Sequence, residues 1–439
     1  MSSSTEAEAE VGAGAGAGAS IGFLACLAFA VGTMVGGGVF ALSGTAINKA
    51  GPAAIASYLL AGSIMLLSAL SFVAVAGRAR TGESGYEPMA GLVGPGLRFL
   101  AMWGFVLNGI LMIPFLLVSF GEHLHDYLLD GVEPLVAALV AIVALTALNF
   151  GSAELVGRAE TYVVGIKIGL LVLFVGVGLA HVGDVHFKPF TTHGTSGMFE
   201  VTALLFTAYT GFNVVTNMAG SVKDPERTVP RAVIGSLLIA IFIYVGVVLA
   251  MLASGIRPFG KAGLVEAAET LIGSTGGELI AMAACLSTLS GANAFLIGTS
   301  EVLHRLAKLG NLPSVVAQTR HGHPLVSVGL IAAASLPLLW VDEEHVVEVA
   351  NVAALAAMIV VNLAAVRLAR AGWPGRGMRL PGGPTLPVIA AVSCAVQFPS
   401  LGPWQCAIGF GFLALGLVLY LYSRSASGPL GMRPAPHAA

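Results

Sequence analysis

The sequence predicts an all-α integral membrane protein with twelve transmembrane helices. Hydrophobic residues make up 56% of the 439 positions and charged residues only 10%, which is less than half of the charge fraction of a typical soluble domain. Apolar runs of about 20 residues recur along the whole chain, and each can cross roughly 30 Å of hydrocarbon as a helix. Because these runs are continuous and show no alternation of polar and apolar residues, helices are predicted rather than barrel strands.

The apolar runs define twelve expected spans between two polar tails. The spans cover residues 21–47, 52–77, 90–120, 133–150, 160–181, 198–219, 231–254, 274–306, 325–341, 345–369, 385–402 and 404–423. Residues 1–20 are acidic and then low in complexity, which is typical of a disordered tail, and they lack the positive n-region of a signal peptide. Residues 424–439 are expected to form the second tail.

Basic residues are predicted to gather on one side of the membrane. When the loops are sorted alternately, roughly 16 lysines and arginines fall on one side and roughly 4 on the other, namely Lys49, Lys188, Arg257 and Lys261. This asymmetry predicts a multi-pass protein of the cell (plasma) membrane whose two tails are both cytoplasmic.

A cluster of glycines interrupts the first expected span. The stretch "GTMVGGGVF" places Gly36, Gly37 and Gly38 in succession near the middle of the membrane. Secondary transporters often consist of two inverted halves whose first helices are broken at this depth. The N–H groups at the start of a half-helix suit a carboxylate, and the carbonyls released before the break can accept from an ammonium group. The alternative is a close helix contact through the GxxxG pair of Gly32 and Gly36.

The sixth expected span carries a matching irregularity. It reads "LLFTAYTGFNVVTNMAG", in which Gly211 is surrounded by Thr207, Thr210 and Asn213. Interruptions in spans 1 and 6 indicate two repeats of five helices, over residues 21–181 and 198–369, followed by two helices over residues 385–423. The alternative for these polar residues is hydrogen bonding between helices.

Three segments resemble the amino acid–polyamine–organocation superfamily. They are "VGTMVGGGVFALSG", "FTAYTGFNVVTNMAGSVKDPERTVPRA" and "SEVLHRLAKLGNLP", which are similar to the signatures of the first helix, of the sixth helix with its following loop, and of the end of the eighth helix. The resemblance implies a LeuT-like core of five plus five inverted helices with two C-terminal helices, and transport of amino acids or related amines.

The resemblance also implies a substrate site built largely from main-chain groups. The substrate carboxylate would lie on the N–H groups of Gly36, Gly37 and Gly38. Its ammonium would lie on carbonyls near these residues of the two breaks: Thr33, Met34, Thr207, Ala208 and Thr210. Asn213, Gly220 and Ser221 stand where the family has acids, so whatever gating or cytoplasmic contacts those acids make in relatives are in doubt here.

Lys167 is the one charged residue of the stretch "TYVVGIKIGLLVLFVGVGLA" in the fifth expected span, and charged residues within a span are expensive and commonly functional. Some members of the superfamily place a helix-5 lysine where sodium-coupled relatives bind the cation, and the pattern "IKIG" fits that position. The resemblance implies that Lys167 bridges the broken first helix and hydroxyls of span 8, for which Ser287 and Ser290 are the candidates. Lys167 would then couple transport to protons or stabilise the site of an exchanger. The alternative is a lysine that extends toward the cytoplasmic interface.

Other classes of function find little support. No basic cluster with interleaved aromatics points to nucleic acid, no histidines and carboxylates have metal-ligand spacing, no cofactor motif is present, and no convergent nucleophile or acid–base pair suggests an enzyme. The four cysteines lie in apolar segments, so no disulfide-linked subunit is expected.

The expected function is that of a secondary transporter for neutral amino acids. The residues of the predicted site are threonines and asparagines, and a cationic side chain buried there would lack a partner. Two alternatives remain open. One is a transporter or antiporter of polyamines or cationic amino acids, which the acidic outer stretches "GEHLHDYLLDGVE" and "VDEEH" favour. The other is a membrane sensor that binds an amino acid without moving it.

Overall fold

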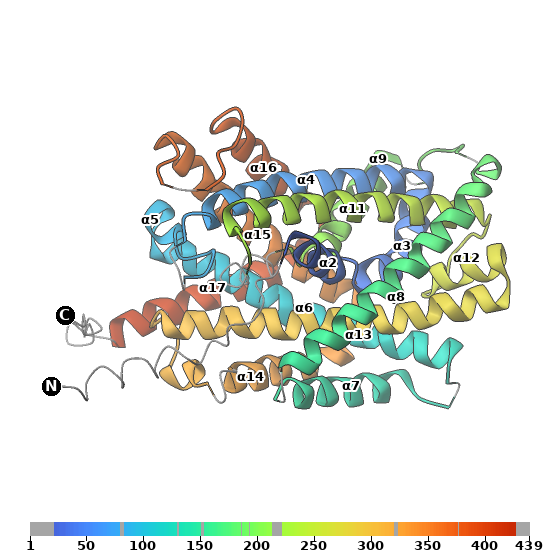
Figure 1. Ribbon diagram of the computed structural model, residues 1–439, viewed down its shortest axis with the longest axis horizontal. Helices are drawn as coiled ribbons and strands as arrows, with labels where there is room; N and C mark the ends of the chain where they lie inside the picture. The colour runs from blue at the N-terminus through green and yellow to red at the C-terminus, as the bar shows by residue number, and fades with distance from the viewer. Residues whose placement is uncertain are drawn as a thin grey trace.

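The computed structural model describes residues 22–79, 83–129, 131–150, 153–185, 187–192, 194–212, 222–319, 324–375 and 377–426. These residues form helices joined by turns and loops (Figure 1), as the sequence predicts. The α-helices are α2 (Phe23–Met34), α3 (Gly37–Ala50), α4 (Ala54–Ala76), α5 (Met89–Val93), α6 (Pro95–Tyr127), α7 (Pro134–Leu148), α8 (Ala153–Ala180), α9 (Gly194–Leu204), α11 (Pro225–Ala253), α12 (Gly263–Ile272), α13 (Ser274–Lys308), α14 (Leu325–Ser335), α15 (Glu343–Arg370), α16 (Thr385–Ala395) and α17 (Pro403–Ala426). The 3₁₀ turns are η1 (Gly51–Ala53), η2 (Val182–Asp184), η3 (Leu205–Tyr209), η5 (Ser314–Ala317), η6 (Leu336–Trp340) and η7 (Phe398–Ser400).

Among these described residues, seven segments are long and apolar enough to cross a membrane, judged by length and composition. They are Gly37–Ala76, Pro95–Tyr127, Tyr162–Ala180, Glu226–Ala253, Ser274–Lys308, Glu343–Arg370 and Pro403–Ser423. Three shorter apolar helical segments are Pro134–Leu148, Leu325–Trp340 and Thr385–Ser400. The number of twelve spans therefore stays a prediction. One reason is that the 12 residues of α2 rise only about 18 Å, too little to cross the bilayer without a second segment.

Two helices form the centre of the molecule. In the 18-residue apolar stretch of α6 and in that of α15, 83% of the residues are buried inside the protein. In the corresponding stretches of α8 and α17, only 28% and 22% of the residues are buried. A helix that is apolar yet exposed needs a hydrocarbon environment. We therefore place α6 and α15 in the core and assign the outer surfaces of α8 and α17 to lipid.

Long helices pack around this centre. In Figure 1, α4 and α11 run side by side along the long axis of the molecule, and α8 crosses α11 at an angle. The short helix α2 lies near the middle of the view and packs against α11 and α8. Since α2 ends inside the protein, its last backbone groups must be satisfied by neighbouring groups or by a ligand.

One helix was absent from the predicted elements. The ten-residue α12 lies between the expected spans 7 and 8 and packs on α13 and α3. Its first turn contains Glu266, and the carboxylate of Glu266 accepts a hydrogen bond from the N–H of Gly260 at 3.1 Å. The sequence pattern gave too short an apolar run for a span, and α12 covers one end of α13 instead.

Candidate functional site

The first predicted span is interrupted between α2 and α3. Helix α2 ends at Met34, and Val35 and Gly36 have non-helical backbone angles before α3 starts at Gly37. The N–H of Gly36 donates to the carbonyl of Met34 at 2.7 Å, so this amide is engaged within the interruption. Gly37 and Gly38 open α3, where N–H groups have no intrahelical acceptor, and Gly36 supplies no side-chain cap. The break is thus one residue earlier and shorter than the glycine triplet suggests.

The second interruption lies at Thr210 and Gly211. Helix α9 tightens into η3, which ends at Tyr209, and Thr210 is extended with φ −75° and ψ 161°. Gly211 has φ +118°, a backbone conformation that side-chain-bearing residues rarely adopt. Residues 213–221 lie outside the described part of the chain, so Asn213, Gly220 and Ser221 have no described position.

The two interruptions lie in direct contact. A Cβ atom added to Gly211 would lie only 3.0 Å from the carbonyl oxygen of Thr33, and one added to Gly38 would lie 2.8 Å from the Cβ of Ala208. The Oγ1 of Thr33 lies 3.4 Å from the Gly211 carbonyl and 2.9 Å from that of Ala30. Glycine at these positions therefore also permits close approach, which is the packing role considered as an alternative for the first span.

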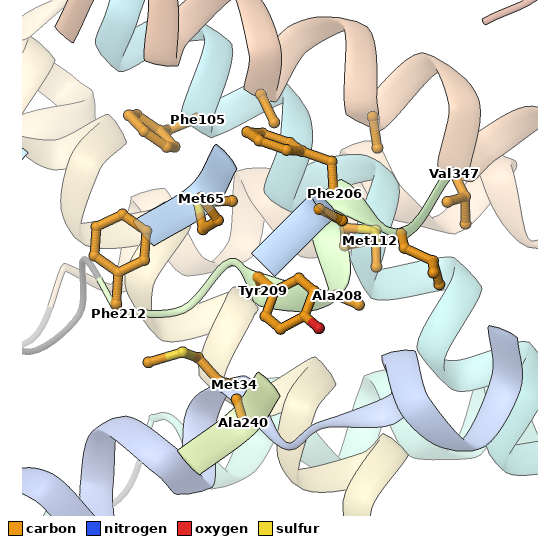
Figure 2. Packing of buried hydrophobic residues seen from close by; sticks show 14 of the residues in the cluster. Met34, Met65, Phe105, Met112, Phe206, Ala208, Tyr209, Phe212, Ala240 and Val347 are labelled. Atoms are coloured by element: carbon orange, nitrogen blue, oxygen red, sulfur yellow. The ribbon is translucent and has the colours of Figure 1, made fainter. Parts of the chain in front are cut away.

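Tyr244 joins the two interruptions from α11. Its hydroxyl lies 2.7 Å from the carbonyl oxygen of Met34 and 3.0 Å from that of Ala208, and its side chain is fully buried. Met34 and Ala208 belong to one buried apolar cluster with Tyr209 and Phe212, and Figure 2 shows these side chains around the unwound segment. Two carbonyls expected to face the substrate ammonium are therefore held by a phenol in this conformation.

A small cavity lies beside the interruptions. Its lining residues are Thr33, Phe105, Asn108, Thr210, Gly211, Ala294, Phe295, Gly298, Thr299 and Val302. Its water-accessible volume of about 30 Å³ has room for roughly two water molecules. Gly36, Gly37 and Gly38 are absent from this lining; Gly37 instead packs against Leu116 and Thr288. An amino acid needs more space than this, so the conformation is closed around the site.

The carbonyl of Thr33 is available at the edge of this cavity. The neighbouring carbonyls at the end of α2 accept hydrogen bonds: Gly32 from Lys167, Met34 from Tyr244, and Val35 from Ser287 at 3.0 Å. Within the described part of the chain, no such donor reaches the carbonyl of Thr33. Because an unpaired buried carbonyl is costly, this oxygen is the best placed of the four to accept from a ligand.

Two asparagines, which the sequence reasoning did not single out, position η3. Asn108 of α6 donates to the Oγ1 of Thr207 at 3.2 Å and to the carbonyl of Ala350 at 3.1 Å. Asn351 of α15 accepts from the N–H of Thr207 and donates to the carbonyl of Leu204, both at 2.9 Å. A polar residue within a long apolar span is itself a signal of function or helix pairing, and this signal could have identified both.

Lys167 lies between three helices. Its ammonium donates to the carbonyl of Gly32 in α2 at 2.8 Å and to the Oγ of Ser290 in α13 at 3.2 Å, and its side chain is fully buried. The lysine therefore points into the protein, and the alternative of a side chain extending to the interface does not describe this conformation. Ser287, the other candidate partner on α13, donates to the carbonyl of Val35 instead. Both serines thus contact the first interruption or its lysine.

Ion pairs connect the helix ends on the side opposite the basic loops. Lys49 of α3 pairs with Glu200 of α9 at 2.8 Å and with Glu344 of α15. Lys261 pairs with Glu343 of α15 at 2.9 Å and with Glu122 of α6. Asp342 begins α15, and its carboxylate accepts from the N–H of Glu344 at 3.1 Å. Through Lys49 and Lys261, these pairs connect the start of α15 to α3, α9 and α6.

Comparisons with known proteins identify relatives along most of the chain. The model of the amino acid permease family matches residues 26–370. A branched-chain amino acid permease, BcaP, of Bacillus subtilis is 27% identical over 90% of this chain and 91% of its own length. A methylthioribose transporter of Bacillus subtilis is 26% identical over 90% of this chain and 92% of its own length. The inner membrane transport protein YbaT of Escherichia coli is 26% identical over 67% of this chain and 71% of its own length.

These matches agree with the interrupted helices and confirm the family expected from the sequence motifs. The family model covers well over half of the chain and includes both interruptions, Lys167 and α15. Membership of this family implies an amino acid substrate. It also means that the buried polar groups belong to a transporter rather than to an enzyme. This chain belongs to the amino acid permease family and is a multi-pass membrane transporter.

Proposed function

We propose that the protein is a secondary active transporter that moves neutral amino acids across the cell membrane, with both termini cytoplasmic. The observation that carries this proposal is the contact between the two helix interruptions, with Gly211 packed on Thr33 beside a small cavity. Main-chain groups at two breaks can bind the charged head of an amino acid without committing an ionised side chain. The asymmetry of basic loops supports the orientation.

The substrate head would lie between the ends of α2 and α3. Its carboxylate would accept from the N–H groups at the start of α3, of which Gly37 and Gly38 are the first, with the amide of Gly36 released from Met34 on binding. Its ammonium would donate to the carbonyl of Thr33 and to carbonyls near Thr207, Ala208 and Thr210. Release of the Ala208 and Met34 carbonyls from Tyr244 would add acceptors. Asn213 remains a proposed contact of the same site.

The cavity favours a neutral and apolar side chain. Phe105, Phe295 and Val302 contribute apolar surface, and none of the described residues that line the cavity is acidic. A cationic side chain in such a pocket would be buried without a partner, which is costly. The similarity to a branched-chain amino acid permease points in the same direction. We therefore place leucine, isoleucine and valine first among the substrates.

The acidic outer surface does not change this preference. Glu122 and Glu343 pair with Lys261, and Glu200 and Glu344 pair with Lys49. The two ammonium groups therefore offset two of these four negative charges in this conformation and weaken the attraction for a cationic substrate. Polyamines and cationic amino acids remain the alternative substrate class, and the transport assay below separates the two.

We further propose that Lys167 takes the place of a coupling cation. Its ammonium holds the carbonyl of Gly32, two residues before the end of α2, and is also hydrogen-bonded to Ser290. Loss of its proton would remove the positive charge from this contact and loosen α2 from α13. In a proton-coupled transporter, proton binding and release at Lys167 would thereby be linked to the position of the first interruption. In an exchanger, the lysine would stay charged and would only stabilise the site.

The test is flux in liposomes that contain the purified protein. We expect saturable uptake of labelled leucine, competition by isoleucine and valine, and weak competition by lysine or putrescine. An inward proton gradient should accelerate net uptake if Lys167 couples protons. Uptake of putrescine or lysine in preference to leucine would replace the substrate proposal, and binding of leucine without counterflow or net flux would favour a sensor.

A further inference from the structure

A second cavity lies away from the interruptions, between α5, α6, α15 and α16. This groove of about 340 Å³ is lined by Val93, Leu97, Leu363, Val366, Arg367, Arg370, Val388, Ala391 and Val392. Helices α6 and α16 each pack on α15, and the groove lies over α15 between them. Figure 1 shows α16 beside α4 and α15, at the periphery of the helical assembly.

The apolar part of the groove is exposed. Leu363, Val388 and Val392 have 42%, 42% and 56% of their surface accessible, although they belong to apolar helices. In a membrane-spanning protein such side chains face acyl chains, because water would be unfavourable beside them. A cavity of this volume and composition suits a hydrocarbon chain.

Two arginines form the polar end of the same groove. Arg367 and Arg370 lie in the last turn of α15 and are exposed, and their spacing of three residues places them on one face of the helix. One guanidinium nitrogen of Arg367 donates to the carbonyl of Leu92 at 2.9 Å, which fixes this side chain at the edge of the groove. None of the described residues that line the groove is acidic, so none of them offsets either positive charge.

The distances fit an amphiphile with a negative head. Leu363 and Arg370 are seven residues apart, which corresponds to roughly 10 Å along the helix axis. An acyl segment beside Leu363 would therefore have its head at the level of the arginines. Guanidinium groups bind phosphate through two parallel N–H donors, and basic pockets between transmembrane helices bind anionic lipid head groups.

We propose that this groove is a binding site for an anionic phospholipid, with a phosphodiester on Arg367 and Arg370 and an acyl chain along Leu363, Val388 and Val392. The lipid belongs to the leaflet on the side of the basic loops. Its occupancy braces the C-terminal end of α15, the helix that also carries Asn351 at the second interruption.

Lipid titration of the detergent-purified full-length protein tests this proposal. Native mass spectrometry would count bound phosphatidylglycerol, and thermal unfolding would be measured with phosphatidylglycerol, phosphatidylcholine or sodium phosphate. We expect phosphatidylglycerol to bind and raise the unfolding temperature more than the other two. The variant R367Q/R370Q should weaken phosphatidylglycerol binding by roughly 30-fold, because each charge near the membrane surface contributes roughly five-fold. A391F, which keeps both charges and fills the apolar groove, should also lose the bound lipid.

The matched control is R227Q/R231Q, which removes two exposed arginines at the start of α11, outside the groove. This control should bind phosphatidylglycerol as the unaltered protein does. The proposal is overturned if the control and R367Q/R370Q lose binding equally, if phosphatidylcholine or sodium phosphate stabilises as well as phosphatidylglycerol, or if A391F retains full binding. If R367Q/R370Q does not fold, R370Q alone provides the same comparison, since Arg370 is exposed at the helix end.

Discussion

The ammonium of Lys167 lies 2.8 Å from the carbonyl oxygen of Gly32, across the interface between α8 and α2. A backbone carbonyl at the end of a helix attracts a cation, because the partial negative charge of the helix dipole concentrates there. The same ammonium reaches Ser290 of α13 at 3.2 Å. One charged side chain thus connects the first interruption to two long helices, and this contact makes Lys167 the first residue to test.

Replacement of Lys167 by alanine is expected to lower leucine uptake and to abolish its acceleration by a proton gradient. The variant leaves the carbonyl of Gly32 without its charged donor, and a lost hydrogen bond of this kind costs about 1.5–3 kcal/mol. If this energy stabilises the transporting conformation, the uptake rate should fall by at least roughly ten-fold. Liposome uptake and proton flux would be measured together. K308A, at the exposed end of α13, is the control and should transport normally. Full gradient-driven uptake by K167A would remove the lysine from the mechanism.

Replacement of Gly211 by alanine is expected to inactivate the site. The residue has φ +118° and its added Cβ would lie 3.0 Å from the carbonyl of Thr33, so the variant adds backbone strain of about 1–3 kcal/mol and separates the two interruptions. Thermal unfolding and uptake would both be measured.

The matched control is G329A in α14, where an added Cβ meets nothing within 4 Å. Alanine is favoured over glycine within a helix by roughly 1 kcal/mol, so G329A should unfold at the same or a higher temperature. Normal uptake by G211A would show that close contact between the interruptions is not required.

Replacement of Tyr244 by phenylalanine tests the bridge between the two breaks. The variant removes the hydroxyl that lies beside the carbonyls of Met34 and Ala208 while it preserves the ring. Loss of this hydroxyl should reduce the free energy of unfolding by about 1–3 kcal/mol, because the Ala208 carbonyl loses this donor, whereas the Met34 carbonyl keeps the N–H of Gly36. A bound amino acid should restore part of this loss if its ammonium takes over these carbonyls, so unfolding would be followed with and without leucine. The control is Y162F, because the ring of Tyr162 is 76% exposed; an equal loss in both variants would contradict the bridge.

The ion pairs of Lys49 and Lys261 are expected to keep the outer side closed. In E343Q or K261Q, the start of α15 loses one bond to Lys261 or Glu343. Exposed pairs of this kind contribute about 0.2–1 kcal/mol, so the fraction of protein molecules open to the outside should rise by up to roughly five-fold. High salt should raise this fraction further, because it screens the remaining ion pairs. Labelling of T210C by an impermeant maleimide, in a background without native cysteines, measures this opening. K188Q, an exposed lysine outside the network, should leave labelling unchanged.

This closure should not depend on titration of Lys261 at physiological pH. Burial lowers the pKa of Lys261, but the hydrogen bonds it donates to Glu122 and Glu343 raise it more, so its pKa lies above the ordinary value. The contribution of a group with a raised pKa is fully present below its ordinary pKa and is lost only as the pH rises through the raised value. Labelling of T210C should therefore show no Lys261-dependent rise between about pH 6 and pH 9; a rise that disappears in K261Q would contradict this.

Much of the architecture was predictable because hydrophobicity and glycine placement are local properties. Continuous apolar runs predicted helices, and the glycines of "VGGGVF" and "YTGF" predicted two interruptions, since a chain without Cβ atoms leaves the helix most easily. Lys167 was conspicuous because a charge within an apolar run has few explanations. The number of spans was harder to predict, since interrupted and short helices do not match the length of a bilayer crossing.

The sequence by itself determined that this is a helical membrane protein of the permease family, and it predicted two broken helices and a functional lysine within the fifth apolar run. Only the tertiary structure decided that the amide of Gly36 is occupied, that Tyr244 holds carbonyls of both breaks, and that Asn108 and Asn351 secure η3. It also brought two arginines of α15 to the end of an apolar groove. The physical reason is that hydropathy and backbone freedom are written along the chain, whereas the partner of a buried polar group is selected by packing between segments far apart in sequence.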